Sequence, residues 1–229
     1  MTGRQGRDCL GIVYIGMGGF EACPTDVSQA GIVWIVSKFL YVFLLSSFRK
    51  TYRSQLNIET TVKLRSWAQS DLASLVKYAN NLNVAKNMTD KFPHPYTEQD
   101  AKEFIEYATA DYPIHIFAID LDGEAIGGIG IHPQSDIHRR NAELGYWLSE
   151  PFWGQGIMSS LIPQVVEFAF STYDIDRVFA RPFGTNTASQ KVLEKNGFRL
   201  EGRFEKVLEK NGAKLDELIY SVRRESWRK

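Results

Sequence analysis

A turn that contains two glycines is the part of this chain best suited to bind a ligand. Gly154 and Gly156 lie in the segment EPFWGQGIMSS, between a predicted strand and a predicted long helix. Glycine lets the backbone adopt positive φ and approach a ligand closely. The first amides of the following helix lack partners within the helix, and the helix dipole makes this end positive. Such a turn can bind a phosphate or a diphosphate, and a plain tight turn is the alternative interpretation.

The hydrophobic pattern predicts the elements that position this turn. Alternating and β-rich residues predict strands over 61–65, 114–121, 124–132, 141–149 and 177–181, and a final hairpin formed by 198–209 and 214–223. Apolar residues at helical spacing predict a helix whose side-chain cap is Ser70 or Asp71, and a second helix that starts with a capping box of Thr97 and Asp100. Two more helices are predicted over 154–172 and 187–195. Strands alternate with helices only in the second half. We therefore expect a mixed α/β (α+β) fold, with a central, mostly antiparallel sheet and helices on both faces.

Composition excludes several classes of protein. The chain has 229 residues, with 27 basic and 27 acidic side chains, so its formal net charge is zero. This balance argues against binding nucleic acid through bulk charge, because phosphate neutralisation needs a basic surplus. The two cysteines, Cys9 and Cys23, lie near the N-terminus, which excludes a disulfide framework elsewhere. The four histidines lack the spacing of metal ligands, and we expect no metal site.

Three linked segments carry a resemblance to a known family. They are ELGYWL at 143–148, FWGQGIM at 152–158 and NTASQKVLEKNGF at 186–198. In these segments the chain resembles the GNAT acetyltransferases over about residues 60–225, most closely the branch of ribosomal-protein N-terminal acetyltransferases (RimJ/RimL-like). The resemblance implies a GNAT fold in which neighbouring strands splay apart and acetyl-CoA binds in the cleft as co-substrate. Trp153 and Met158 stand where the family's turn more often has Gln or Arg and Gly or Ala, but the main-chain amide of Met158 remains available.

The same resemblance implies which residues contact the coenzyme. The diphosphate would lie on the amides from Gln155 to Ser160, and Asn186 would bond the pantetheine arm. Asn186 also precedes the predicted helix 187–195 and is suited to cap it. The full set of expected coenzyme contacts is Trp147, Leu148, Gln155, Gly156, Ile157, Met158, Ser159, Ser160, Asn186 and Ser189.

Acyl transfer from a thioester to an amine requires a neutral amine, a base, donors for the oxyanion and support for the leaving thiolate. Glu143 is the candidate base, because it lies on the strand before the turn and the resemblance places it on the acceptor side. A surface glutamate in a salt bridge is the alternative. Residues 56–229 contain no cysteine, which excludes an acyl-cysteine intermediate. Direct transfer in a ternary complex is the simple route that remains.

The acid that serves the thiolate is less clearly marked. Many GNAT members have a tyrosine four residues before Gly-Phe, and this chain has Leu193 there. In the branch named above, a serine at the position of Ser189 is thought to serve the thiolate. Ser189 is therefore the candidate acid, with an ordinary helix serine as the alternative. Tyr146 and Tyr220 are weaker candidates.

The first 55 residues form an extension ahead of the predicted domain, 56–229. Its apolar segment 30–48 has nineteen residues and is followed by Arg49, Lys50 and Arg53. A helix of that length spans about 28 Å, close to the hydrocarbon core of a bilayer, although Lys38 lies near its middle. A membrane anchor, a helix packed on the domain and a dispensable extension all remain open. The positive-inside rule would hold the catalytic domain in the cytoplasm.

These observations predict an N-acetyltransferase that acts on a primary amine. The expected acceptor is the N-terminal α-amine of a protein or peptide. A small-molecule amine acetyltransferase and a non-catalytic acetyl-CoA-binding regulatory module are the alternatives. The segment 87–96 is rigid and aromatic, and the resemblance places it over the acceptor entrance. A monomer and a homodimer are both compatible with the sequence.

Overall fold

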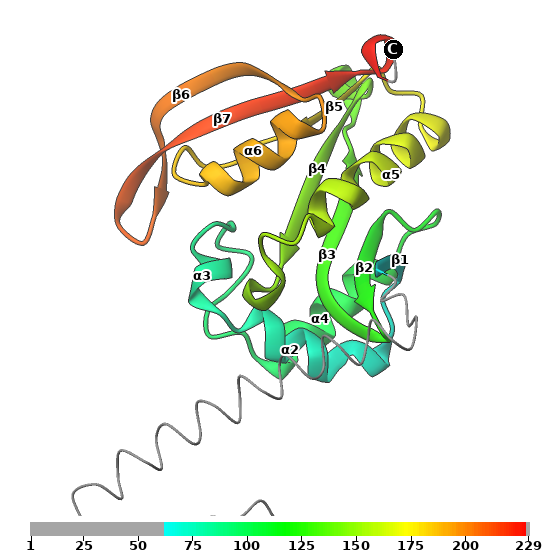
Figure 1. The fold of residues 1–229 in the computed structure, drawn as a ribbon, viewed down its shortest axis with the longest axis vertical. Coiled ribbons are helices and arrows are strands. Elements are labelled where there is room, and N and C mark those ends of the chain that lie inside the picture. Colours follow the sequence, from blue (N-terminus) through cyan, green and yellow to red (C-terminus); the bar gives the residue numbers. More distant parts are fainter. Residues whose placement is uncertain (1–61, 228–229) are drawn as a thin grey trace, which may run out of the picture. The chain divides into compact units, whose positions relative to one another are not determined.

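A seven-stranded sheet organises residues 62–227, the part of the chain that the computed structural model describes (Figure 1). Its strands are β1 (Val62–Ser66), β2 (Ile116–Leu121), β3 (Glu124–Pro133), β4 (Asn141–Leu148), β5 (Arg177–Ala180), β6 (Arg199–Lys210) and β7 (Ala213–Arg223). Their order across the sheet is β1-β2-β3-β4-β5-β7-β6. Neighbouring strands are antiparallel except β4 and β5, which are parallel. The predicted mixed, mostly antiparallel sheet is confirmed.

Helices cover both faces of this sheet. They are α2 (Leu72–Ala79), α3 (Leu82–Ala85), α4 (Glu98–Thr109), α5 (Ile157–Thr172) and α6 (Thr187–Lys195). Short 3-10 turns occur at Gln69–Asp71, Asp136–His138, Glu150–Phe152 and Arg224–Ser226. The sequence prediction missed α3, because four residues are too few to show a helical repeat.

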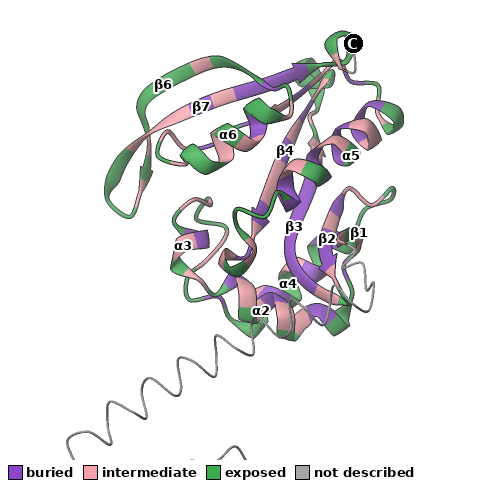
Figure 2. Cartoon of the chain, viewed as in Figure 1, coloured by how far each residue is buried: buried purple, intermediate pink, exposed green. Residues whose placement is uncertain are grey.

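Alternation of side chains along the strands divides the core into two clusters. In one, Ile129 and Ile131 of β3 pack with residues of α5 such as Ile162. In the other, Ile116 and Ala118 of β2 pack with buried residues of α2 and α4. Figure 2 shows β3 buried along most of its length, whereas β6 at the edge of the sheet is largely exposed. Apolar burial on both faces holds the central strands in place.

Local signals explain where several elements begin and turn. Asp122 and Gly123 both have positive φ in the β2–β3 turn, as a two-residue hairpin requires. Thr97 caps α4 through a capping box with Asp100, as predicted. The predicted side-chain cap on the first helix is wrong: Asp71 precedes α2 without capping it. Its carboxylate instead accepts hydrogen bonds from the Arg65 guanidinium at 2.6 and 2.7 Å.

The predicted extension over 1–55, including the apolar segment 30–48, lies outside the described residues. Among residues 62–227, no helix has the length and apolar character needed to cross a bilayer.

Candidate active site

The only parallel strand pair in the described sheet opens into a cavity. β4 and β5 are paired at three positions, from Asn141 opposite Arg177 to Glu143 opposite Phe179. β4 then continues for five more residues to Leu148 without pairing to β5. Because strands rise about 3.3 Å per residue, this leaves roughly 16 Å of β4 without a partner on that side. A cavity of about 520 Å³ lies at this gap.

Five segments that are distant in the sequence line this cavity. They are β4 from Glu143 onward, the turn into α5, the end of β5 with the following loop, one face of α6, and α3 with the residues after it. The cavity therefore contains all three segments that carry the family resemblance. Of the predicted site residues, those on its lining are Glu143, Trp147, Leu148, Gly156, Ile157, Met158, Ser159, Asn186 and Ser189.

The glycine turn has the backbone geometry expected of an anion site. Gly154 and Gly156 have φ of +73° and +78°, and Gly156 is the N-cap of α5. A Cβ placed on either glycine would have no neighbour within 4 Å, so the backbone is open to a ligand there. The amides of the first turn of α5, Ile157 to Ser159, precede the first helical hydrogen bond and are available as donors.

Two of the predicted coenzyme contacts already make hydrogen bonds within the protein. Gln155 and Ser160 are not part of the cavity lining. The Ser160 amide donates to the carbonyl of Gly156 at 3.1 Å, so the helix already uses it. The Gln155 side chain donates to the carbonyl of Pro151 at 3.0 Å. The bond of the Ser160 amide weighs against a coenzyme contact through that amide, whereas the contact predicted for the main-chain amide of Gln155 is unaffected by its side-chain bond and stays a prediction.

The two unusual residues of the turn have structural roles. The indole N–H of Trp153 donates to the carbonyl of Leu148 at 2.7 Å and so joins the turn to the end of β4. Met158 is 7% exposed and belongs to the core cluster beneath α5. Its side chain therefore leaves the amide side of the turn clear. The larger residues of this turn are compatible with a phosphate site.

Glu143 lines the cavity within an ion pair. Both of its carboxylate oxygens accept hydrogen bonds from Arg181, at 3.0 Å from Nε and 2.9 Å from Nη2. This bond raises the pKa of Arg181, which therefore remains a cation. Arg181 also lies 3.6 Å from a carboxylate oxygen of Glu217. The structure shows the salt bridge that was the alternative interpretation of Glu143, and the role of base stays a prediction.

The two hydroxyl groups considered as acids are brought together. The Tyr146 hydroxyl lies 2.8 Å from Oγ of Ser189, across 43 residues of sequence. Burial raises the pKa of Tyr146 to about 12. Asn186 caps α6 as predicted, because its Oδ1 accepts the amide of Ser189 at 3.1 Å. Tyr220 lies away from the cavity lining and donates to Glu194 at 2.9 Å.

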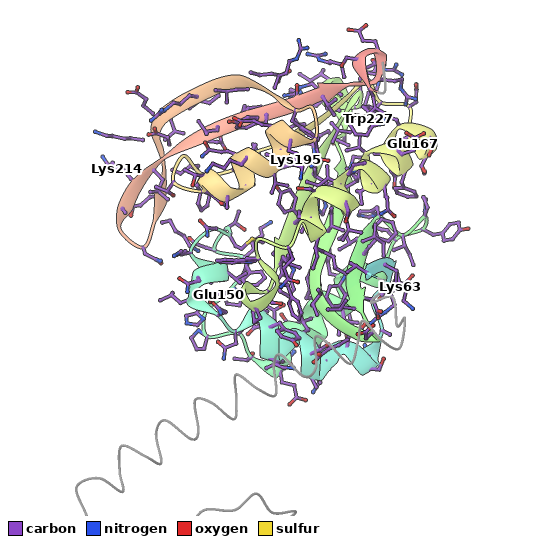
Figure 3. All side chains as sticks on the ribbon, in the orientation of Figure 1. Lys63, Glu150, Glu167, Lys195, Lys214 and Trp227 are labelled. Carbon is purple, nitrogen blue, oxygen red and sulfur yellow. The ribbon has the colours of Figure 1, made fainter. Side chains whose placement is uncertain are left out.

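A further group was missed by sequence reasoning. Glu150, which precedes the glycine turn and is labelled in Figure 3, accepts hydrogen bonds from the side-chain amides of Asn81 at 2.8 Å and Asn83 at 3.0 Å. These bonds hold α3 beside the turn across nearly 70 residues, a distance at which no local pattern could reveal them. Asn81 also caps α3.

The predicted acceptor loop also reaches the cavity. Residues 87–89, at the start of segment 87–96, are part of the lining. Asp90, next in the chain, accepts a hydrogen bond from Lys210 on the β6–β7 hairpin at 2.7 Å. Within residues 62–227 no group of three or more His, Cys, Asp and Glu side chains is placed to hold a metal ion.

Comparisons with known proteins agree with this geometry. The uncharacterized N-acetyltransferase YoaA of Bacillus subtilis is 38% identical over 99 residues, which are 43% of this chain and 55% of YoaA. The ribosomal-protein-serine acetyltransferase of Escherichia coli is 32% identical over 87 residues, which are 38% of this chain and 48% of that protein. The matches thus span about half of each relative.

A solved structure and a family model extend the match over most of the described residues. RimJ of Mycobacterium smegmatis, solved in complex with CoA-disulfide, has a TM-score of 0.63 and 26% identity, over 73% of this chain and 84% of that chain. The model of the acetyltransferase (GNAT) domain matches residues 61–199, which include the splayed strands and the glycine turn. This chain belongs to the GNAT acetyltransferase family.

Proposed function

We propose that this protein transfers the acetyl group of acetyl-CoA to the N-terminal α-amine of a protein, by direct attack in a ternary complex. The observation that carries the proposal is the gap between β4 and β5, with free amides and open glycines on its lining together with Glu143. The protein acceptor is supported by the E. coli relative, which is named for acetylation of a ribosomal protein. An acceptor of this kind also agrees with the cytoplasmic location expected from the sequence.

The two sides of β4 separate the roles of its residues. Leu144 packs in the core cluster that contains α5, whereas Trp147 packs in the cluster that contains α2 and α4. Because side chains alternate along a strand, Glu143 points to the side of Trp147, and Tyr146 to the side of Leu144. The amine would therefore approach from the side of Glu143 and the thioester from the side of Tyr146, and they would meet in the gap between the strands.

The residues that line the gap can assist the reaction of the amine with the thioester. Glu143 first takes a proton from the bound ammonium group, directly or through water, and the neutral amine nitrogen then forms a bond to the thioester carbon. Each carboxylate oxygen uses one lone pair for Arg181 and keeps another for this proton. As the carbon–sulfur bond breaks, the sulfur receives a proton from the Tyr146–Ser189 pair of hydroxyls, and the second proton that the nitrogen loses restores that pair through solvent. Direct transfer needs no covalent enzyme intermediate.

Replacing Tyr146 with phenylalanine should lower kcat about tenfold and leave the KM for acetyl-CoA unchanged. The effect is modest for a general acid because a thiol has a reference pKa of about 8.5 and is already a fair leaving group. A hydroxyl donates only below its pKa, which is about 12 for Tyr146. The wild-type rate should therefore show no falling limb up to about pH 10.

The matched control is Tyr220→Phe, which removes a buried hydroxyl away from the cavity. Steady-state kinetics over pH 6–10 measure both variants. Equal rates for Tyr146→Phe and wild type, or a wild-type rate that falls with an apparent pKa near 9, would contradict the role given to Tyr146.

The acceptor class is tested with the full chain and a panel of amines. The panel contains a peptide with a free N-terminus, the same peptide blocked at its N-terminus and carrying one lysine, and small amines such as a polyamine and an amino acid. Mass spectrometry should find one acetyl group on the free α-amine. Acetylation of a small amine alone would favour the small-molecule alternative, and coenzyme binding with no turnover would favour a regulatory module.

A further inference from the structure

One face of α6 lines the cavity from its first turn to its last. The lining residues Ser189, Val192 and Lys195 are spaced three apart, and Ala188 lies four residues before Val192, which places all of them along one stripe of the helix. Ser189 lies beside Tyr146 at the first turn of α6. Lys195, which is labelled in Figure 3, is the last residue of the helix. The two residues are six apart, which corresponds to about 9 Å along a helix. The stripe thus has the Tyr146–Ser189 pair at its N-terminal end and the positively charged side chain of Lys195 at its C-terminal end.

Among the described residues, the ammonium group of Lys195 has no charged partner. The glycine turn, WGQGIMSS, contains no basic residue. Among the cavity-lining residues the only Lys and Arg side chains are Arg181 and Lys195, and Arg181 is already bonded to Glu143 on both of its carboxylate oxygens. Lys195 is exposed, and in residues 62–227 its ammonium group has neither a hydrogen bond nor an ion pair. Acetyl-CoA, in contrast, brings a diphosphate and a 3′-phosphate.

We propose that Lys195 binds a phosphate of the coenzyme and supplies the positive charge that the glycine turn lacks. The inference rests on the proposed function, because it requires acetyl-CoA in this cavity. Main-chain amides and the dipole of α5 stabilise an anion only partially, since they carry fractional charges. A full ammonium charge within hydrogen-bond reach of a phosphate adds a charge-assisted bond. The phosphate is either the 3′-monoester or the diphosphate, and the two are distinguished by the ligand used.

The test compares Lys195→Gln, Lys195→Arg and the control Lys191→Gln by calorimetric titration with CoA and with 3′-dephospho-CoA. Lys191 lies one turn earlier on α6, is exposed and is not part of the cavity lining. Lys195→Gln should raise the Kd of CoA about tenfold, the size expected of one charge-assisted hydrogen bond. Lys195→Arg and Lys191→Gln should stay within about twofold of wild type. Raising the salt from 50 to 200 mM should weaken the wild type more than Lys195→Gln.

A comparison of CoA with 3′-dephospho-CoA shows which phosphate Lys195 binds. If Lys195 binds the 3′-phosphate, Lys195→Gln and wild type should bind dephospho-CoA equally. If it binds the diphosphate, the variant should lose affinity for both ligands alike. A Lys195→Gln variant that binds CoA as tightly as wild type, with an unchanged melting temperature, would overturn the role of Lys195 alone. A folded wild-type protein that binds neither ligand would overturn the proposed function as well.

Discussion

Replacing Glu143 with glutamine should lower kcat/KM for the acceptor by about 10²- to 10³-fold, within the range of general-base catalysis. Glutamine retains the size of the side chain and one oxygen for Arg181, but it cannot take the proton of the attacking amine. An α-amino group has a reference pKa of about 7.7–8.0, so most acceptor is protonated at neutral pH. The defect should shrink as the pH rises toward 9, because the free amine then reaches the site already neutral. Steady-state kinetics with a peptide acceptor measure both effects.

Glu217 provides the matched control for this variant. It is the second carboxylate near Arg181, at 3.6 Å, but it is not part of the cavity lining. Glu217→Gln therefore removes a charge from the same cluster without removing the proposed base, and it should keep most of the activity. Calorimetry should give the same Kd for CoA in both variants. A Glu143→Gln enzyme within about threefold of wild type at pH 7 would show that Glu143 is only a partner of Arg181.

Replacing Gly156 with valine should raise the Kd of CoA at least 100-fold. Gly156 has φ of +78°, and a Cβ there meets no protein atom within 4 Å. The added methyl groups would project into the open space where a phosphate must reach the first amides of α5. The left-handed backbone also disfavours a β-branched residue by roughly 1–2 kcal/mol, so the melting temperature should fall by a few degrees. Calorimetry measures the affinity, and thermal unfolding measures the stability.

Gly123→Val separates these two effects. Gly123 has φ of +90°, its Cβ would also be free of neighbours, and it lies in the β2–β3 turn away from the cavity lining. This control should lose comparable stability yet bind CoA as the wild type does. If Gly156→Val and Gly123→Val bind CoA equally, the phosphate does not lie on the glycine turn.

Much of the fold could be predicted because its signals are local. The Asp122-Gly123 turn joins Leu121 to Glu124, and the capping box of Thr97 with Asp100 and the cap of Asn186 on α6 also join residues three positions apart. Such features depend only on the types of residues close together in the sequence, and the structure confirms them. The cap expected at Asp71 was wrong because a tertiary partner, Arg65, takes its carboxylate. The same carboxylate also accepts the Ala68 amide at 2.9 Å, so its local bond is made ahead of the 3-10 turn and not at the first turn of α2.

The amino-acid sequence by itself determined every strand and all helices but α3, the glycine turn and, through three linked segments, the family to which the chain belongs. The tertiary structure alone decided the partners within the cavity. It pairs Glu143 with Arg181 and Tyr146 with Ser189, across 38 and 43 residues. It also leaves Lys195 unpaired at the end of the stripe on α6. The physical reason is that strand pairing and burial set these distances, and both depend on contacts between segments far apart in the chain.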